Sequence, residues 1–138
     1  MKIVRGRTSK AIRHAGPDQV IGKLWMDPVI DEDSIRASNV VFEAGGRNHW
    51  HRHEVAQIIV MGSGEGIIAD RSGVVHRLLP GDIVYTGPGE EHWHGASPHS
   101  FVTYFVLSVG STEMFDEKVS DDEYLAAWKR VAPSASLD

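Results

Sequence analysis

Short apolar runs alternate with turn-forming residues along most of the chain, from about residue 20 to residue 109. The turn-forming clusters are rich in glycine, proline, aspartate and serine, and they lie at 28, 45–46, 62–64, 70–73, 80–81 and 87–89. Many short strands at this spacing are typical of an antiparallel sandwich or barrel. The pattern predicts strands over residues 20–26, 35–43, 55–61, 66–69, 74–79, 82–86, 92–95 and 101–109.

Only the C-terminal segment has a helical pattern. Ser120 with Glu123 three residues later forms a capping box, which predicts a helix that begins there. Tyr124, Trp128 and Val131 recur at the spacing of one helical face. We expect this apolar stripe to cover exposed core of the barrel, and docking across a dimer is the alternative.

The chain has 138 residues, which suits one domain. We divide it into an irregular lead-in over 1–19, a β-barrel over 20–110, and a C-terminal helix and tail over 111–138. The longest strongly apolar stretch, residues 58–61, is too short to cross a bilayer, and no apolar segment follows the basic start as in a signal peptide. A cytoplasmic location without membrane partners is therefore predicted.

Composition and charge narrow the chemistry. A net charge of −5 argues against a broad phosphate-binding surface and so against a nucleic-acid partner. The chain has eight histidines and no cysteine. Disulfides, thiolate nucleophiles and cysteine-bound metals are thereby excluded. Any metal must be held by nitrogen and oxygen ligands.

Five of the eight histidines fall in two short windows, at 49, 51 and 53 and at 92 and 94. Alternate side chains of a strand point to opposite faces, so Val55 and Gln57 are expected on the face of His51 and His53. Ala56, Ile58 and Val60 are expected on the other face. One strand with His-x-His and a remote strand with a third imidazole can assemble a divalent-metal site. Solvated or hydrogen-bonded structural histidines are the alternative.

These residues resemble the two signature motifs of the cupin superfamily. Residues 45–64 read G-x5-H-x-H-x3-Q-x6-G and contain His51, His53 and Gln57, and residues 81–96 read G-x5-G-P-G-x2-H-x3-A and contain His92. The resemblance implies an all-β single-domain fold, a jelly-roll barrel or double-stranded β-helix, followed here by the C-terminal helix. It also implies one divalent transition metal, held by His51, His53, Gln57 and His92.

Gln57 stands where cupins usually have a glutamate. A neutral ligand set leaves the +2 charge of the ion uncompensated, which should make it a stronger Lewis acid at some cost in retention. The alternative is a decayed site that no longer binds metal. Manganese and iron are expected from the family resemblance, while imidazole and amide ligands also suit zinc, nickel, cobalt and copper.

The glutamine and the following HWHGA segment resemble a group of small bacterial cupins that includes (R)-selective hydroxynitrile lyases. In that group a histidine on the last barrel strand serves as base, and the position falls on Tyr104 here. A tyrosine with an ordinary pKa near 10 is mostly a proton donor at neutral pH. His94, on the ligand face, is the other candidate acid or base. The structural alternative is a hydrogen bond by which His94 only supports the residues around the metal.

The resemblance thus implies a metal-dependent enzyme that acts on a small oxygenated molecule by Lewis-acid and acid/base chemistry, with a carbon–carbon lyase or isomerase favoured. The alternatives are a three-histidine iron dioxygenase and a non-catalytic module that binds a small ligand or metal. The apolar outward set at 56, 58 and 60 predicts a homodimer or higher homo-oligomer. Trp50 and Trp93 are expected to point away from the metal, as core or interface aromatics.

Overall fold

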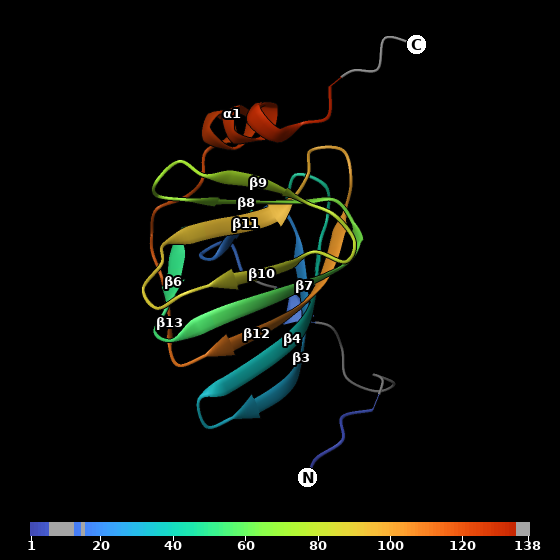
Figure 1. Cartoon of the computed structure of the whole chain (residues 1–138), viewed down its shortest axis with the longest axis vertical. Coiled ribbons are helices and arrows are strands. Elements are labelled where there is room, and N and C mark those ends of the chain that lie inside the picture. Colours follow the sequence, from blue (N-terminus) through green and yellow to red (C-terminus); the bar gives the residue numbers. More distant parts are fainter. Residues whose placement is uncertain (6–12, 15, 135–138) are drawn as a thin grey trace.

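The computed structural model describes residues 1–5, 13–14 and 16–134 and contains two curled antiparallel sheets that face each other around a common interior (Figure 1). One sheet has the strand order β1-β3-β4-β12-β7-β10. The other has the order β13-β6-β11-β5-β2, with β8 pairing to β11 and β9 to β8. The strands are β1 Arg13–His14, β2 Val20–Ile21, β3 Leu24–Glu32, β4 Ile35–Phe42, β5 Arg47–Asn48, β6 His51–His53, β7 Ala56–Gly64, β8 Gly66–Asp70, β9 Val75–Leu78, β10 Ile83–Thr86, β11 His92–Ala96, β12 Val102–Val109 and β13 Thr112–Met114.

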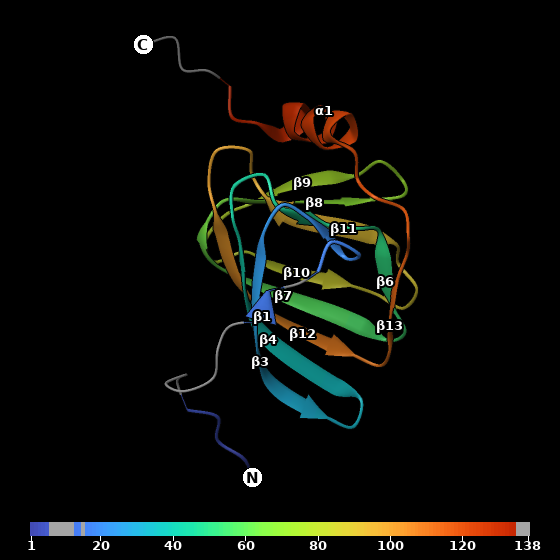
Figure 2. The same ribbon diagram turned by 180° about the vertical axis from the view of Figure 1, so that it is seen from behind.

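The single helix of this part of the chain, α1 (Asp121–Val131), lies across the end of the barrel beside β8 and β9 (Figures 1 and 2). Ser120 caps it as the sequence predicts, because its hydroxyl accepts a hydrogen bond from the Glu123 amide at 3.1 Å. The buried residues of the helix are Tyr124, Ala127 and Trp128. No helix among the described residues is long and apolar enough to cross a membrane.

Two apolar clusters build the interior. The first fills the barrel between the sheets, and its members include Phe42, Ile59 and Tyr104. The second lies between β8, β11 and the helix, and joins Trp50 and Trp93 to Tyr124 and Trp128. Trp50 and Trp93 are thus core aromatics under the helix, as expected, and the apolar stripe of the helix covers core.

The β3 strand differs from its prediction. We expected a strand that ends before Pro28, but β3 runs from Leu24 to Glu32. Its pairing with β4 shifts register between Pro28 and Ile30. A bulge tolerates a residue that has no N–H to donate, so the proline bends this strand rather than ending it.

Several short strands were also missing from the prediction. The turn expected at 62–64 belongs to β7, while β5, β6 and β13 have only two or three residues each and were not predicted. The chain bends at residues 54–55, between β6 and β7. Val55 is therefore 46% exposed instead of lying on the face of the histidines, and Ala56 is buried rather than outward. From Gln57, which is buried, alternate residues again point to opposite faces of the strand, as expected.

The expected lead-in over 1–19 and the tail lie partly outside the described residues. Within the lead-in, Arg13–His14 forms β1 and pairs with β3.

Candidate metal centre

The three imidazoles of the predicted ligand set come from two neighbouring strands. His51 and His53 lie on β6, and His92 lies on β11, where it is paired directly with His51. All three side chains are buried. One ring nitrogen from each lies within 4.8 Å of the others, so the three histidines form a group that could hold a metal ion. Gln57 adds an amide from β7 in the facing sheet.

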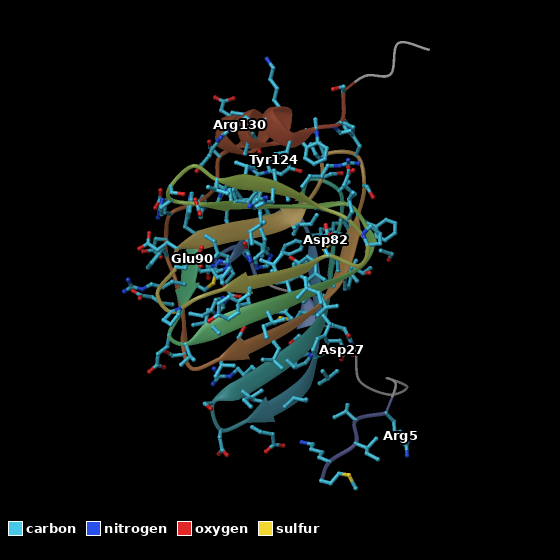
Figure 3. The ribbon with its side chains drawn as sticks, viewed as in Figure 1. Arg5, Asp27, Asp82, Glu90, Tyr124 and Arg130 are labelled. Atoms are coloured by element: carbon cyan, nitrogen blue, oxygen red, sulfur yellow. The ribbon has the colours of Figure 1, made fainter. Side chains whose placement is uncertain are left out.

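Each of these histidines is anchored through Nδ1. His51 Nδ1 donates to the His49 carbonyl and His92 Nδ1 to the Glu90 carbonyl, while His53 Nδ1 is hydrogen-bonded to Thr112 Oγ1, each at 2.9 Å. Glu90 lies on the loop before β11 (Figure 3). A neutral ring that donates from Nδ1 has its lone pair on Nε2. The three Nε2 atoms are thereby prepared as metal ligands, in the manner of metal-binding histidines generally.

The ligand atoms themselves show the fit to a cation. His53 Nε2 is buried and has no hydrogen-bond partner among the described residues. His92 Nε2 lies 3.0 Å from Gln57 Oε1, and both atoms are acceptors once Nδ1 carries the proton. Two acceptors that face each other with no cation between them repel. A separation of about 3 Å is the one expected for two ligands that bind the same ion at a right angle, each through a bond of about 2.1 Å. The donor set therefore fits a divalent metal.

Electrostatics keeps these rings neutral. Burial lowers the pKa of His51 well below its usual value of 6.5, and the neighbouring His92 lowers it further. Burial, followed by the charge of His92, lowers the pKa of His53 to about 4. The pKa of His92 is also lowered, mainly by burial. Only a neutral imidazole can bind a metal, so the site is ready for one at neutral pH.

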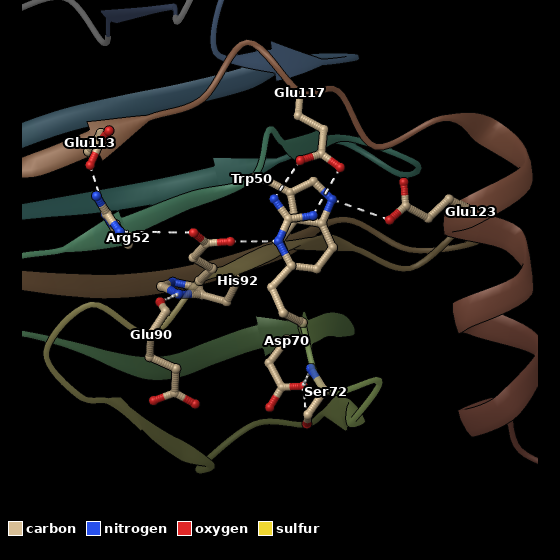
Figure 4. A network of polar contacts seen from close by, with 11 residues as sticks. Trp50, Arg52, Asp70, Ser72, Glu90, His92, Glu113, Glu117 and Glu123 are labelled. Carbon is tan, nitrogen blue, oxygen red and sulfur yellow. Dashed lines mark hydrogen bonds and ion pairs between the residues drawn. The ribbon is translucent and has the colours of Figure 1, made fainter.

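A polar network outside the barrel supports β6 (Figure 4). The Arg71 guanidinium stacks 3.7 Å from the Trp50 ring centre and bonds to Glu91 and Glu117. The Trp50 indole donates to Glu123 on the helix at 3.2 Å. Trp50 immediately precedes His51, so this stack restrains the backbone that carries the ligand pair.

His94 makes a different set of contacts from the three ligands. Its backbone N–H donates to Asn48 Oδ1 at 2.9 Å, which orients the amide so that Asn48 Nδ2 donates to His94 Nε2 at 3.1 Å. His94 must then carry its proton on Nδ1, which donates to the Tyr104 hydroxyl at 2.5 Å. The Asn48 contact occupies the Nε2 lone pair that a fourth metal ligand would need.

Gly95 permits this arrangement. A Cβ at this position would overlap the Gly46 carbonyl oxygen and the Arg47 backbone. The absence of a side chain lets β5 approach β11, which brings Asn48 beside His94. The sequence contains no local signal for this contact, because 46 residues separate its two partners.

A cavity of about 480 Å³ opens onto the site from the barrel mouth. His51, His53, Gln57, His94 and Asn48 line its polar end, and its apolar wall includes Leu24, Met26, Val40, Phe42 and Val106. Arg36 and Asp31 lie in its lining as well. The cavity is large enough for a small organic molecule.

Tyr104 lies on β12, the last long strand of the first sheet, as expected. It is buried in the first core cluster behind His94 and is not part of the cavity lining. Burial raises its pKa well above the usual value of 10, so its hydroxyl stays protonated. Tyr104 can therefore orient His94 but is not positioned to act as a base. The structure also shows contributions that were not predicted: Asn48, Thr112 and the Glu90 carbonyl.

The remaining histidines are elsewhere. His49 lies in the link between β5 and β6, where its carbonyl accepts a hydrogen bond from His51 and its ring is buried outside the cavity lining. His76 and His99 are exposed. The side chain of His14 lies outside the described residues.

Sequence comparisons find a matching domain family and a related protein. The model of the cupin domain family matches residues 38–108, about half of the chain. An (R)-mandelonitrile lyase from Granulicella tundricola is 34% identical over 116 residues, which cover 79% of this chain and 88% of the relative.

Solved structures extend the similarity to the whole fold. A cupin-like protein from Thermotoga maritima superposes with a TM-score of 0.81 at 28% identity, covering 88% of this chain and 97% of the other. A polyketide cyclase from Streptomyces resistomycificus has a TM-score of 0.68 at 18% identity, covering 96% and 95%, and shares the fold alone. These neighbours confirm the expected double-stranded β-helix. With both motifs, the three-histidine group and the fold in agreement, the chain belongs to the cupin family.

Proposed function

We propose that this cupin is a divalent-metal-dependent enzyme that acts on a small oxygenated molecule, as a carbon–carbon lyase of the hydroxynitrile-lyase type. The observation that supports it best is the group of three buried histidines beside His94, of which His51 and His53 line the same cavity as His94. The similarity to an (R)-mandelonitrile lyase favours this reaction over others possible on the fold.

His51, His53, His92 and Gln57 are the proposed ligands. Manganese or iron is the proposed metal, although this donor set also suits zinc, cobalt, nickel and copper. When bound, the ion supplies Lewis acidity toward a substrate oxygen, undiminished by any ligand carboxylate.

His94 is the proposed catalytic base. Its Nε2 takes the proton of the substrate hydroxyl, after that hydroxyl replaces the Asn48 N–H as its partner. The carbonyl group then forms as the carbon–carbon bond breaks, and the leaving carbanion equivalent, cyanide in a cyanohydrin, departs with the electron pair. The Tyr104 oxygen accepts the Nδ1 hydrogen of His94 throughout and stabilises the imidazolium.

The test is release of benzaldehyde from (R)-mandelonitrile by the manganese-loaded protein, followed by ultraviolet absorbance. His94→Ala should lower kcat by about 100-fold or more, the scale of a lost general base. Tyr104→Phe should have a smaller effect, and His99→Ala, at an exposed loop position, none. Full activity of the His94 variant with metal content unchanged would refute the proposed base.

Two other outcomes would favour a different function for this protein. Substrate-dependent oxygen consumption by the Fe(II) form would favour the three-histidine dioxygenase. Saturable binding without conversion of any cyanohydrin or related hydroxy compound would favour a ligand-binding module.

The homodimer or higher oligomer also stays a proposal. Its support is the outer face of the first sheet, where Ile58, Val60, Ile83 and Tyr85 are exposed on the neighbouring strands β7 and β10. An apolar patch of this kind is typical of an interface. The cytoplasmic location likewise remains a prediction.

A further inference from the structure

A polar row crosses the inner face of the first sheet near the strand ends where β4 and β7 begin and β12 finishes. Ser108 on β12 is paired with Gln57 on one side and with Arg36 on the other. Directly paired residues share a face of the sheet. The row therefore connects the proposed metal ligand Gln57, through Ser108, to the Arg36 guanidinium.

The row becomes more exposed away from the metal site. Gln57 is buried, Ser108 is half-buried, and the Arg36 side chain is 59% exposed at the entrance. All three line the same cavity. Two interstrand steps of about 4.8 Å place the Gln57 and Arg36 backbones about 10 Å apart, a distance that the long arginine side chain shortens.

Arg36 also has unused hydrogen-bonding capacity. Its Nε contacts Asp31 Oδ1 at 3.3 Å, and its two terminal Nη groups have no partner among the described residues. Guanidinium Nη groups bind carboxylates in a bidentate manner. Asp31 is 77% exposed and so is free to turn away when another anion approaches.

The charges of the cavity lining favour an acidic ligand. The opposite charges of Arg36 and Asp31 cancel each other, so a bound divalent ion leaves the cavity lining with a net positive charge. A ligand that carries a carboxylate would offset part of this excess.

We infer that the substrate of this site is a small acid, with a metal-binding hydroxyl group at one end and a carboxylate at the other that binds Arg36. The inference rests on the proposed metal-dependent function, for which (R)-mandelonitrile is a model substrate without the far carboxylate. It adds a specificity-determining residue to that function. Ser108 lies between the two ends, where its hydroxyl can meet the chain of the ligand.

The experiment compares two probes on the manganese-loaded protein by isothermal titration calorimetry. 2-Hydroxyadipate and 2-hydroxyhexanoate have the same metal-binding end and differ in whether the far end is a carboxylate or a methyl group. The wild type should bind 2-hydroxyadipate about tenfold more tightly, the scale of one charge-assisted contact. Arg36→Gln should abolish this preference and leave 2-hydroxyhexanoate binding unchanged.

Two further variants separate a specific contact from general charge. Asp31→Asn removes the competing carboxylate and should increase the preference for 2-hydroxyadipate. Lys23→Gln removes an exposed cation outside the cavity lining and should leave the preference unchanged. Equal binding of both probes to the wild type, or a full preference in the Arg36→Gln variant, would overturn the inference.

A failure of the proposed metal role can be distinguished from a failure of the Arg36 contact. If the His51→Ala/His53→Ala variant binds both probes as the wild type does, the metal role is refuted while the Arg36 preference stands. If both probes lose affinity in that variant but never differ from each other, the metal role stands and the Arg36 contact is refuted.

Discussion

At the scale of single residues, the candidate site depends on where protons lie. Three histidines have Nδ1 bound to an oxygen atom, with His53 Nε2 unpartnered and His92 Nε2 beside Gln57 Oε1. His94, in contrast, has both nitrogens occupied by Asn48 and Tyr104. These hydrogen bonds thereby distinguish the three proposed ligands from His94, the proposed base, although all four rings are neighbouring imidazoles. The motif spacing indicated which histidines belong together, but only these hydrogen bonds give each ring a separate role.

Removal of the ligand pair tests the site directly. The His51→Ala/His53→Ala variant should lose stoichiometric metal, because one imidazole and one neutral amide remain to hold the ion. Elemental analysis of the purified protein measures this, with His99→Ala as the matched control. Metal content equal to that of the wild type would refute the site.

The pH dependence of the metal-free protein follows from the same rings. Burial lowers the pKa of His53 to about 4 in the folded state, while the unfolded chain has the ordinary value of 6.5. The unfolded state therefore binds more protons between these values, and the free energy of unfolding should fall as the pH decreases from 6.5 to 4. Urea unfolding at several pH values measures this fall. His53→Gln should show a shallower dependence, and an identical slope in both proteins would contradict the assignment.

At the scale of elements, the helix illustrates how far local sequence signals reach. The capping box located its start, and the Ser120 cap is present. The Glu123 carboxylate, however, accepts a hydrogen bond from the Trp50 indole at 3.2 Å and not from the Ser120 N–H that would complete the capping box. The same residue thus ties the helix to the strand region that carries the histidines.

Loss of the cap should have a measurable cost. Ser120→Ala removes the acceptor for the Glu123 amide and should lower the free energy of unfolding by about 1 kcal/mol. Chemical denaturation measures it, and Ser72→Ala, in the exposed turn between β8 and β9, offers a serine control outside the helix. An unchanged midpoint would show that the rest of the helix contacts dominate.

At the scale of the whole molecule, the two faces of the first sheet have different surroundings. Its inner face lines the cavity, while its outer face leaves Ile58, Val60, Ile83 and Tyr85 exposed. Ile83 and Tyr85 are 69% and 66% exposed. A second copy of the chain is the proposed cover.

Charges on this face should prevent association. Ile83→Glu with Tyr85→Glu would place four buried carboxylates in a two-fold interface. Their desolvation penalty would exceed the stabilisation from the remaining contacts. Light scattering coupled to size-exclusion chromatography should then report a smaller particle than the wild type. Leu125→Glu, at an exposed helix position, is the control. A monomeric wild type would contradict the proposed interface.

The sequence by itself determined the fold class, the order of most strands, the helix and the histidine group, because period-2 patterning, turn residues and motif spacing are local properties. It did not determine the run of β3 through Pro28, the exposure of Val55, or the buried position of Tyr104. Each of these depends on register or on a bend set by distant strands. Only the tertiary structure brought Asn48 to His94 and aligned Gln57, Ser108 and Arg36 in one row, since these contacts join segments far apart in the chain.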